Sequence, residues 1–107
     1  MAVLCRFTTA TALAAATLLP ESNPLAAADA GNGLVLARRW CASCHVVAPD
    51  QRTQTGEAAP FATIAKQPDF SVEKVALFLL DPHPKMPDMG LSRASAADLA
   101  AYIATLK

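Results

Sequence analysis

Cysteine is scarce in this chain of 107 residues, and its scarcity removes one class of site at the outset. Two of the three cysteines, Cys41 and Cys44, form a C-x-x-C pair, and His45 follows directly. Beyond these, only Cys5 and His83 could act as thiolate or imidazole ligands. A structural zinc site needs four ligands, and the chain has no second C-x-x-C or H-x-x-x-H pair. The sequence therefore argues against structural zinc.

An excess of charge of either sign is also absent. Nine Lys and Arg balance nine Asp and Glu, so the formal net charge is zero. Nucleic-acid-binding proteins usually present a broad basic field, and this class is therefore excluded. Long-range attraction to charged partners is weak in such a protein, so docking must depend on local patches.

The sequence contains no apolar run of membrane-spanning length. The run Phe7–Leu19 has thirteen uncharged residues, whereas a helix that crosses a bilayer needs about 20. One positive charge precedes the run, and a proline-interrupted stretch after it ends in Ala26–Ala28. This order predicts a secretory signal peptide over residues 1–28, cleaved before Asp29. We therefore expect an exported protein of the periplasm, without a stable membrane anchor after cleavage.

Cleavage at this position leaves a single small domain over residues 29–107. It contains 107 minus 28, or 79, residues and has lost Cys5, so no disulfide framework is available to it. Domains of this size bury a modest fraction of their surface and often need a metal, a cofactor or disulfides for stability. Without disulfides, we expect this domain to depend on a bound metal or cofactor.

The pentapeptide Cys41-Ala42-Ser43-Cys44-His45 supplies it, because C-x-x-C-H is the attachment signature of c-type haem. The two cysteines are about one helical turn apart, so both thiols project from the same side of the chain. Each can form a thioether with one vinyl group of a single porphyrin. His45 is then placed to ligate the iron. The motif predicts one haem c, covalently bound through Cys41 and Cys44.

Helical signals dominate the rest of the domain, and no strand pattern competes. We expect four short helices: about Ala30–Trp40, one opened by Pro60, one capped by Ser71, and one from Ser92 to the C-terminus. Gly33 is a poor helix former, so we expect another helix to cross closely there. The apolar residues expected to face inward are Leu34, Leu36, Ala37, Phe61, Ile64, Ala65, Val75, Phe78, Leu79, Leu99, Tyr102, Ile103 and Leu106.

Between the third and fourth expected helices, the segment Pro82–Gly90 contains three prolines and a glycine. These residues hold the chain extended, and an extended loop can press one side chain against the open face of a haem. The candidate ligands are Met86, Met89 and His83. A methionine thioether is a soft, neutral donor that favours reduced iron. Met89 could instead fill a gap in the core, and His83 could be an exposed loop residue.

The order of these motifs, with Pro60-Phe61, Lys85-Met86-Pro87 and Asp98–Ile103, resembles that of class I monohaem cytochromes c of the small bacterial periplasmic kind. The resemblance extends from Gly33 to Leu106 and implies a small all-α cytochrome c fold around one haem. It implies that the first and last helices cross at Gly33, where Leu99 and Tyr102 pack.

The resemblance also implies roles for site residues. Met86, followed by Pro87, is the expected second axial ligand of the iron. The carbonyl of Pro60 is expected to accept the hydrogen bond of His45 and so to orient that ligand. One departure is that no aromatic residue stands four positions before Cys41, so Tyr102 lacks the usual aromatic neighbour there.

A haem iron with both axial positions filled favours an electron carrier over an enzyme or a gas sensor, which need an open position. The resemblance thus implies a one-electron carrier that meets redox partner proteins, donor and acceptor, through transient docking at the haem edge. The alternative is a dedicated cytochrome c subunit of an extracytoplasmic dehydrogenase or oxidase, because the same residues would serve it.

Overall fold

The computed structural model describes residues 27–53, 57–81 and 84–107. Within these ranges the regular elements are four helices: α1 (Ala30–Trp40), α2 (Phe61–Ala65), α3 (Val72–Leu80) and α4 (Arg93–Ala104). The expected all-α fold is confirmed. The predicted signal peptide lies outside the described residues except for Ala27 and Ala28, and its cleavage remains a prediction.

Side-chain caps fix where three of the helices begin. The carboxylate of Asp29 accepts a hydrogen bond from the backbone nitrogen of Asn32 at 3.0 Å, which caps α1. The hydroxyls of Ser71 and Ser92 do the same for α3 and α4. Such caps satisfy amide groups that have no partner inside the helix. The helix starts predicted from Ser71 and Ser92 are confirmed.

The last helix ends earlier than predicted. Its final residue is Ala104, and Thr105 is the C-cap rather than part of a helix that continues to Lys107. The Thr105 hydroxyl donates to the carbonyl of Tyr102 at 2.6 Å, and the Thr105 amide donates to the same carbonyl at 2.9 Å. Threonine side chains compete in this way for the carbonyls of the preceding turn, which ends the helix.

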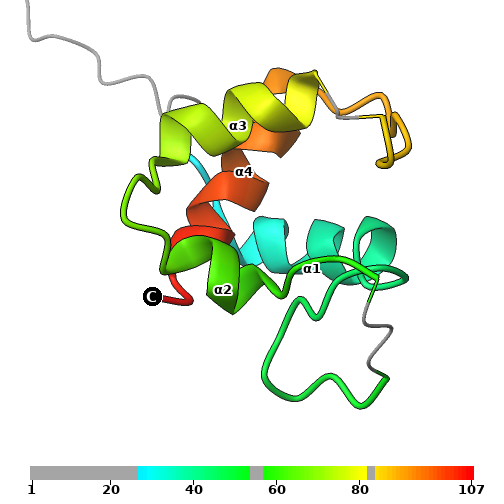
Figure 1. The fold of residues 1–107 in the computed structure, drawn as a ribbon. Helices are drawn as coiled ribbons and strands as arrows, with labels where there is room; N and C mark the ends of the chain where they lie inside the picture. The colour runs from blue at the N-terminus through cyan, green and yellow to red at the C-terminus, as the bar shows by residue number, and fades with distance from the viewer. Residues whose placement is uncertain (1–26, 54–56, 82–83) are drawn as a thin grey trace, which may run out of the picture.

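Helix α4 is the centre of the fold. Helices α1, α2 and α3 each contact α4, and in the described part of the chain they make no helix-to-helix contact with one another. Figure 1 shows α4 between α1 and α3, with α2 near the C-terminus. The fully buried apolar side chains come from α1, the loop after it, α2 and α4; the largest are Leu99, Ile103 and Val47.

The crossing of α1 and α4 requires a glycine. A Cβ atom at Gly33 would overlap the backbone carbonyl of Asp98 and would lie 2.7 Å from the Cβ of Tyr102. Real Cβ atoms do not approach other atoms so closely, so only glycine lets the two backbones meet here. The predicted role of Gly33 is confirmed, and the backbone of Asp98 is the nearest part of α4.

Helix α3 departs from the sequence prediction. Val75 and Leu79 pack against the core, but Phe78, which was expected to face inward, is 49% exposed. Leu77 and Leu80 are exposed as well, and no residue of α3 is fully buried. The reason is that α3 packs on α4 alone, so the apolar residues flanking Val75 and Leu79 meet no other helix.

Candidate functional site

The two cysteines of the C-x-x-C-H motif lie in the turn that follows α1. The amide of Cys41 donates to the carbonyl of Ala37 at 2.9 Å, and the amides of Cys44 and His45 donate to the carbonyl of Cys41 at 3.2 and 2.9 Å. The chain therefore continues to coil after α1 ends. Cys41 is buried, Cys44 is half-buried, and no disulfide joins them.

Burial raises the pKa of the Cys41 thiol to about 11, so this sulfur is uncharged at neutral pH. A neutral thioether sulfur is accommodated in an apolar core without a charge to desolvate. The surroundings of Cys41 therefore suit a covalently attached group better than a thiolate that binds a metal.

The imidazole of His45 is held by one short hydrogen bond. Its Nδ1 lies 2.6 Å from the carbonyl oxygen of Ala59. A carbonyl can only accept, so Nδ1 carries the proton and Nε2 keeps its lone pair for a metal. The ring of Phe61 lies 5.1 Å from the imidazole at an angle of 52°. These two contacts fix the orientation of the imidazole and leave Nε2 as its free donor atom.

The acceptor of that hydrogen bond corrects the sequence prediction, which named the carbonyl of Pro60. The Pro60 carbonyl instead accepts from the amides of Thr63 and Ile64, at 3.0 and 3.1 Å, because Pro60 is the N-cap of α2. The residue before a proline adopts extended backbone, which separates the Ala59 carbonyl from the helix and leaves it for His45. Pro60 therefore acts on His45 through the conformation of the chain.

Gln51 was missed by sequence reasoning. Its Oε1 accepts from the amide of Val47 at 2.8 Å. Its Nε2 donates to the carbonyls of His45 at 3.0 Å and Thr53 at 2.8 Å. One side chain therefore holds together the loop that begins at His45. Glutamine has no sequence signature for this role, and only its two-sided hydrogen-bonding capacity suggests it.

Arg38 also ties this loop to α1. One guanidinium nitrogen, Nη2, donates to both carboxylate oxygens of Asp50, at 2.9 and 3.1 Å. Both side chains are substantially exposed, so the pair adds little stability. Its effect is to position the loop over the end of α1.

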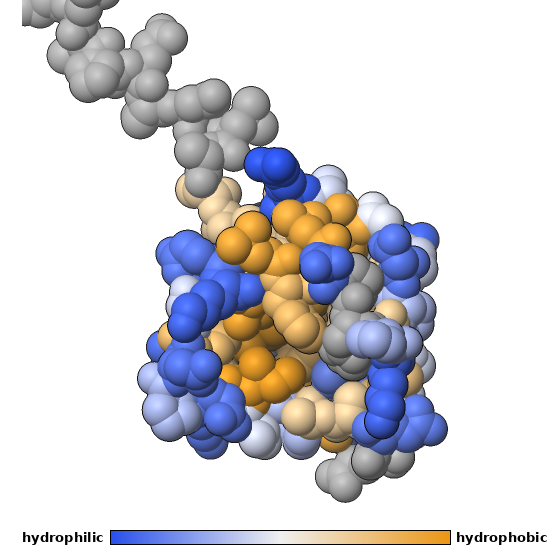
Figure 2. Space-filling view, turned by 45° about the horizontal axis from the view of Figure 1, so that its top comes forward, coloured by the Kyte–Doolittle hydropathy of each residue, from blue (hydrophilic) through white to orange (hydrophobic). Residues whose placement is uncertain are grey.

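An apolar hollow opens on one face of the molecule. Figure 2 shows hydrophobic residues lining this hollow and hydrophilic residues around it. Phe78 and Leu80 of α3 and Trp40, next to Cys41, are large apolar side chains that remain exposed. A porphyrin is a flat apolar ring, and burying such surface against it is favourable. The donor set and the uncovered apolar surface therefore both fit a haem.

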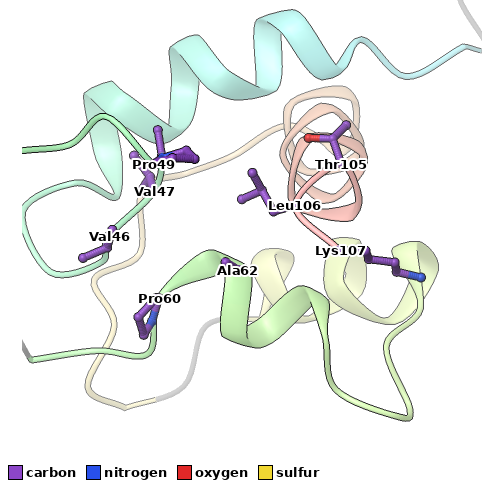
Figure 3. Close-up of a pocket in the computed structure, with 9 residues that line it drawn as sticks. Val46, Val47, Pro49, Pro60, Ala62, Thr105, Leu106 and Lys107 are labelled. Atoms are coloured by element: carbon purple, nitrogen blue, oxygen red, sulfur yellow. The ribbon is translucent and has the colours of Figure 1, made fainter.

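A cavity of about 350 Å³ lies beside the segments that follow His45 and Ala59. Figure 3 shows it between the loop after His45, the start of α2 and the C-terminus. Its lining residues are Val46, Val47, Ala48, Pro49, Pro60, Ala62, Thr105, Leu106 and Lys107. The polar side chains of this lining are Thr105, whose hydroxyl donates to the Tyr102 carbonyl, and Lys107, whose ammonium lies over the ring of Phe70. The rest of the lining is apolar.

The loop between α3 and α4 carries the candidate second ligand. Met86 and Met89 are both half-buried, and His83 lies outside the described residues. Asp88 accepts a hydrogen bond from the amide of Gly90 at 2.8 Å, and Gly90 has a φ of +60°, which favours glycine. Figure 1 shows this loop on the same side of the view as the turn after α1.

Two further features were searched for in the described part of the chain. Among residues 27–53, 57–81 and 84–107, no three His, Cys, Asp or Glu side chains gather as a protein-only metal site. None of the helices in the same ranges is long and apolar enough to cross a membrane.

Comparison with known proteins supplies the family. The chain is 58% identical over 87 residues to cytochrome c-552 from Bradyrhizobium diazoefficiens, a match that covers 81% of this chain and 84% of the relative. No protein-family model matches the chain. No solved structure matches it either. Together with a C-x-x-C-H turn that ends in an oriented histidine, the relationship shows that this chain belongs to the class I c-type cytochromes, electron-transfer proteins with covalently bound haem c.

Proposed function

We propose that the chain is a one-electron carrier whose haem iron is ligated by His45 and Met86. The observation that carries the proposal is the 2.6 Å contact between Nδ1 of His45 and the Ala59 carbonyl, because it leaves Nε2 for the iron. Bound to the chain, the haem supplies an iron that gains and loses one electron. The protein supplies fixed ligands and an apolar enclosure.

His45 contributes orientation and basicity. The proton that Nδ1 shares with the Ala59 carbonyl makes the other ring nitrogen a stronger donor. The Phe61 ring and the Gln51 hydrogen bond to the His45 carbonyl restrain the ring and the backbone. A histidine whose ring and backbone are both restrained moves little when the iron changes oxidation state. Electron transfer is then fast, because little rearrangement of the protein accompanies it.

Met86 is the proposed second ligand. Two features support it: a thioether suits haem iron, and Pro87 stiffens the chain beside it. With both axial positions filled, the protein has no position at which oxygen or peroxide can bind. Met86 thereby keeps the haem a carrier.

We place this carrier in the periplasm, after cleavage between Ala28 and Asp29. Ala27, Ala28 and Asp29 are all exposed, and the predicted site is the Ala-rich end of the signal. Redox partner proteins are proposed to dock at the haem edge, where Trp40 and Phe78 leave apolar surface exposed. Lys66, Lys74 and Lys85 are exposed charges that could surround such a patch. The balanced net charge indicates brief, locally guided encounters.

Optical spectra of the purified protein test the proposal. The reduced protein should give the same spectrum with and without carbon monoxide, because no axial position is open. The oxidised protein should show the long-wavelength band of sulfur bound to iron. Carbon monoxide binding by the native reduced protein would overturn the ligation. Size-exclusion of a native extract should show a free monomer, whereas co-elution with an oxidoreductase would support the subunit role instead.

A further inference from the structure

Asp98, in the middle of α4, holds the beginning of α1. Its Oδ1 accepts a hydrogen bond from the backbone nitrogen of Asp29 at 2.7 Å. Its Oδ2 accepts one from Nδ2 of Asn32 at 2.8 Å. The two contacts join residues 69 and 66 positions apart in the chain. One carboxylate thus links the first residues of the domain to the last helix.

The helix crossing fixes the position of this carboxylate. Gly33 meets the backbone of Asp98 itself, so the side chain of Asp98 emerges next to the start of α1. Within α1, the Asp29 carbonyl accepts from the amide of Gly33 at 2.9 Å, and the Asp29 carboxylate accepts from the amide of Asn32. The carbonyl and carboxylate of Asp29 thus bond within α1, whereas its backbone nitrogen bonds to Asp98 in α4.

Two carboxylates lie at the beginning of α1, those of the N-cap Asp29 and of Asp98. They offset the partial positive charge that the N-terminus of a helix carries. An ammonium group at the backbone nitrogen of Asp29 would be unfavourable beside this helix end unless carboxylates lay close by. The carboxylates of Asp29 and Asp98 lie there and can balance its charge.

Resting on the cleavage proposed above between Ala28 and Asp29, we propose that Asp98 is the binding partner of the new amino terminus. Hydrolysis of the Ala28–Asp29 peptide bond consumes one water and leaves a carboxylate on Ala28 and an amine on Asp29. The amine takes up a proton, and the 2.7 Å contact becomes an ion pair between an ammonium and a carboxylate. Charge-assisted hydrogen bonds are stronger than neutral ones, so removal of the signal strengthens the α1–α4 crossing.

The test compares two haem-loaded proteins with different N-termini, each verified by intact mass. One begins at Asp29, and the other retains Ala26–Ala28, so that Asp29 again has an ordinary amide. Each is made with Asp98 and with Asp98→Asn, and unfolding by denaturant is measured. Asp98→Asn should lower the folding equilibrium constant about two- to fivefold more in the protein that begins at Asp29. This excess should shrink at high salt.

Asp69→Asn is the matched control, because Asp69 is an exposed aspartate in the segment between α2 and α3. It should affect both proteins equally. Equal losses from Asp98→Asn with both N-termini would overturn the ion pair. If Asp98→Asn fails to fold, the rate at which a reagent acylates the α-amine is measured in the two proteins that keep Asp98. The rate should be lower in the protein that begins at Asp29 than in the one that retains Ala26–Ala28. Equal rates would refute the ion pair between the amine and Asp98.

Sequencing the N-terminus of the naturally exported protein tests the cleavage itself. A first residue other than Asp29 would refute the proposed cleavage. The excess effect of Asp98→Asn in the protein that begins at Asp29 would not depend on that result. The two failures are thereby distinguishable.

Discussion

The hydroxyl of Tyr102, in α4, donates a 2.6 Å hydrogen bond to the carbonyl of Val47, two residues after His45. Both residues are buried. The tyrosine therefore fixes the loop that begins at the haem-binding turn. A buried hydroxyl needs such a partner, and a main-chain carbonyl 55 positions away provides it.

Tyr102→Phe should destabilise the haem-loaded protein by about 1–2 kcal/mol, because the buried Val47 carbonyl loses its donor. Denaturant unfolding at neutral pH measures this loss. An unchanged unfolding midpoint would contradict the role given to the hydroxyl.

The pH dependence of the same pair has a definite sign. Burial raises the pKa of Tyr102, with smaller and opposing effects from Arg38 and Asp50. The stabilisation is therefore complete below the unfolded-state pKa of about 10 and is lost as the pH rises through the higher folded value. Unfolding measured on both sides of this range should show the difference between native protein and Tyr102→Phe disappearing at high pH.

Gly33→Ala should cost about 3 kcal/mol or more, because a Cβ would overlap the backbone of Asp98, which a side-chain rotation cannot relieve. Val35→Ala, at an exposed site of the same helix, should stay within about 0.5 kcal/mol. Thermal unfolding of the two variants makes the comparison. Equal stability of Gly33→Ala and Val35→Ala would mean that α1 and α4 do not meet as closely as described.

Met86→Ala should open the iron to carbon monoxide in the reduced protein and remove the sulfur-to-iron band of the oxidised one. Met89→Ala should keep the band and cost about 1–2 kcal/mol, since its side chain is only half-buried. Reversed results would make Met89 the ligand. An unchanged axial spectrum in both variants would point to His83.

Replacing both Cys41 and Cys44 by Ser should leave an exported chain that is largely unfolded and sensitive to protease. The helices α1 and α3 make no contact with each other, and Leu77, Phe78 and Leu80 of α3 are exposed. Circular dichroism and limited proteolysis report the outcome. Native helix content in this variant would show that the four helices hold together by themselves.

Local signals in the sequence predicted much of this structure. The hydroxyls of Ser71 and Ser92 cap helices, and the missing side chain of Gly33 lets two helices meet. Each of these roles follows from the residue type alone. The bounds of α1 and the start of α2 followed from such signals. The C-x-x-C-H motif likewise fixes its chemistry within five residues.

What the sequence could not show depends on the path of the backbone. Any residue has a carbonyl, so nothing in the sequence distinguishes Ala59 from Pro60 as the partner of His45. The hydrogen bonds of Gln51 and the contact from Tyr102 to Val47 likewise end on main-chain groups. Phe78 shows a different limit: apolar periodicity marks a side chain that avoids water but not whether protein or cofactor covers it.

For the export proposed above, the central position of α4 sets the order in which the chain can close. A chain that crosses a membrane with its N-terminus first presents the turn with Cys41 and Cys44 well before the last twelve-residue helix. Because α1, α2 and α3 pack on α4 and not on one another, none of them has a lasting surface to rest on until that helix arrives. On this proposal the attachment turn stays open while the chain crosses the membrane, and the arrival of α4 then closes the protein around its haem.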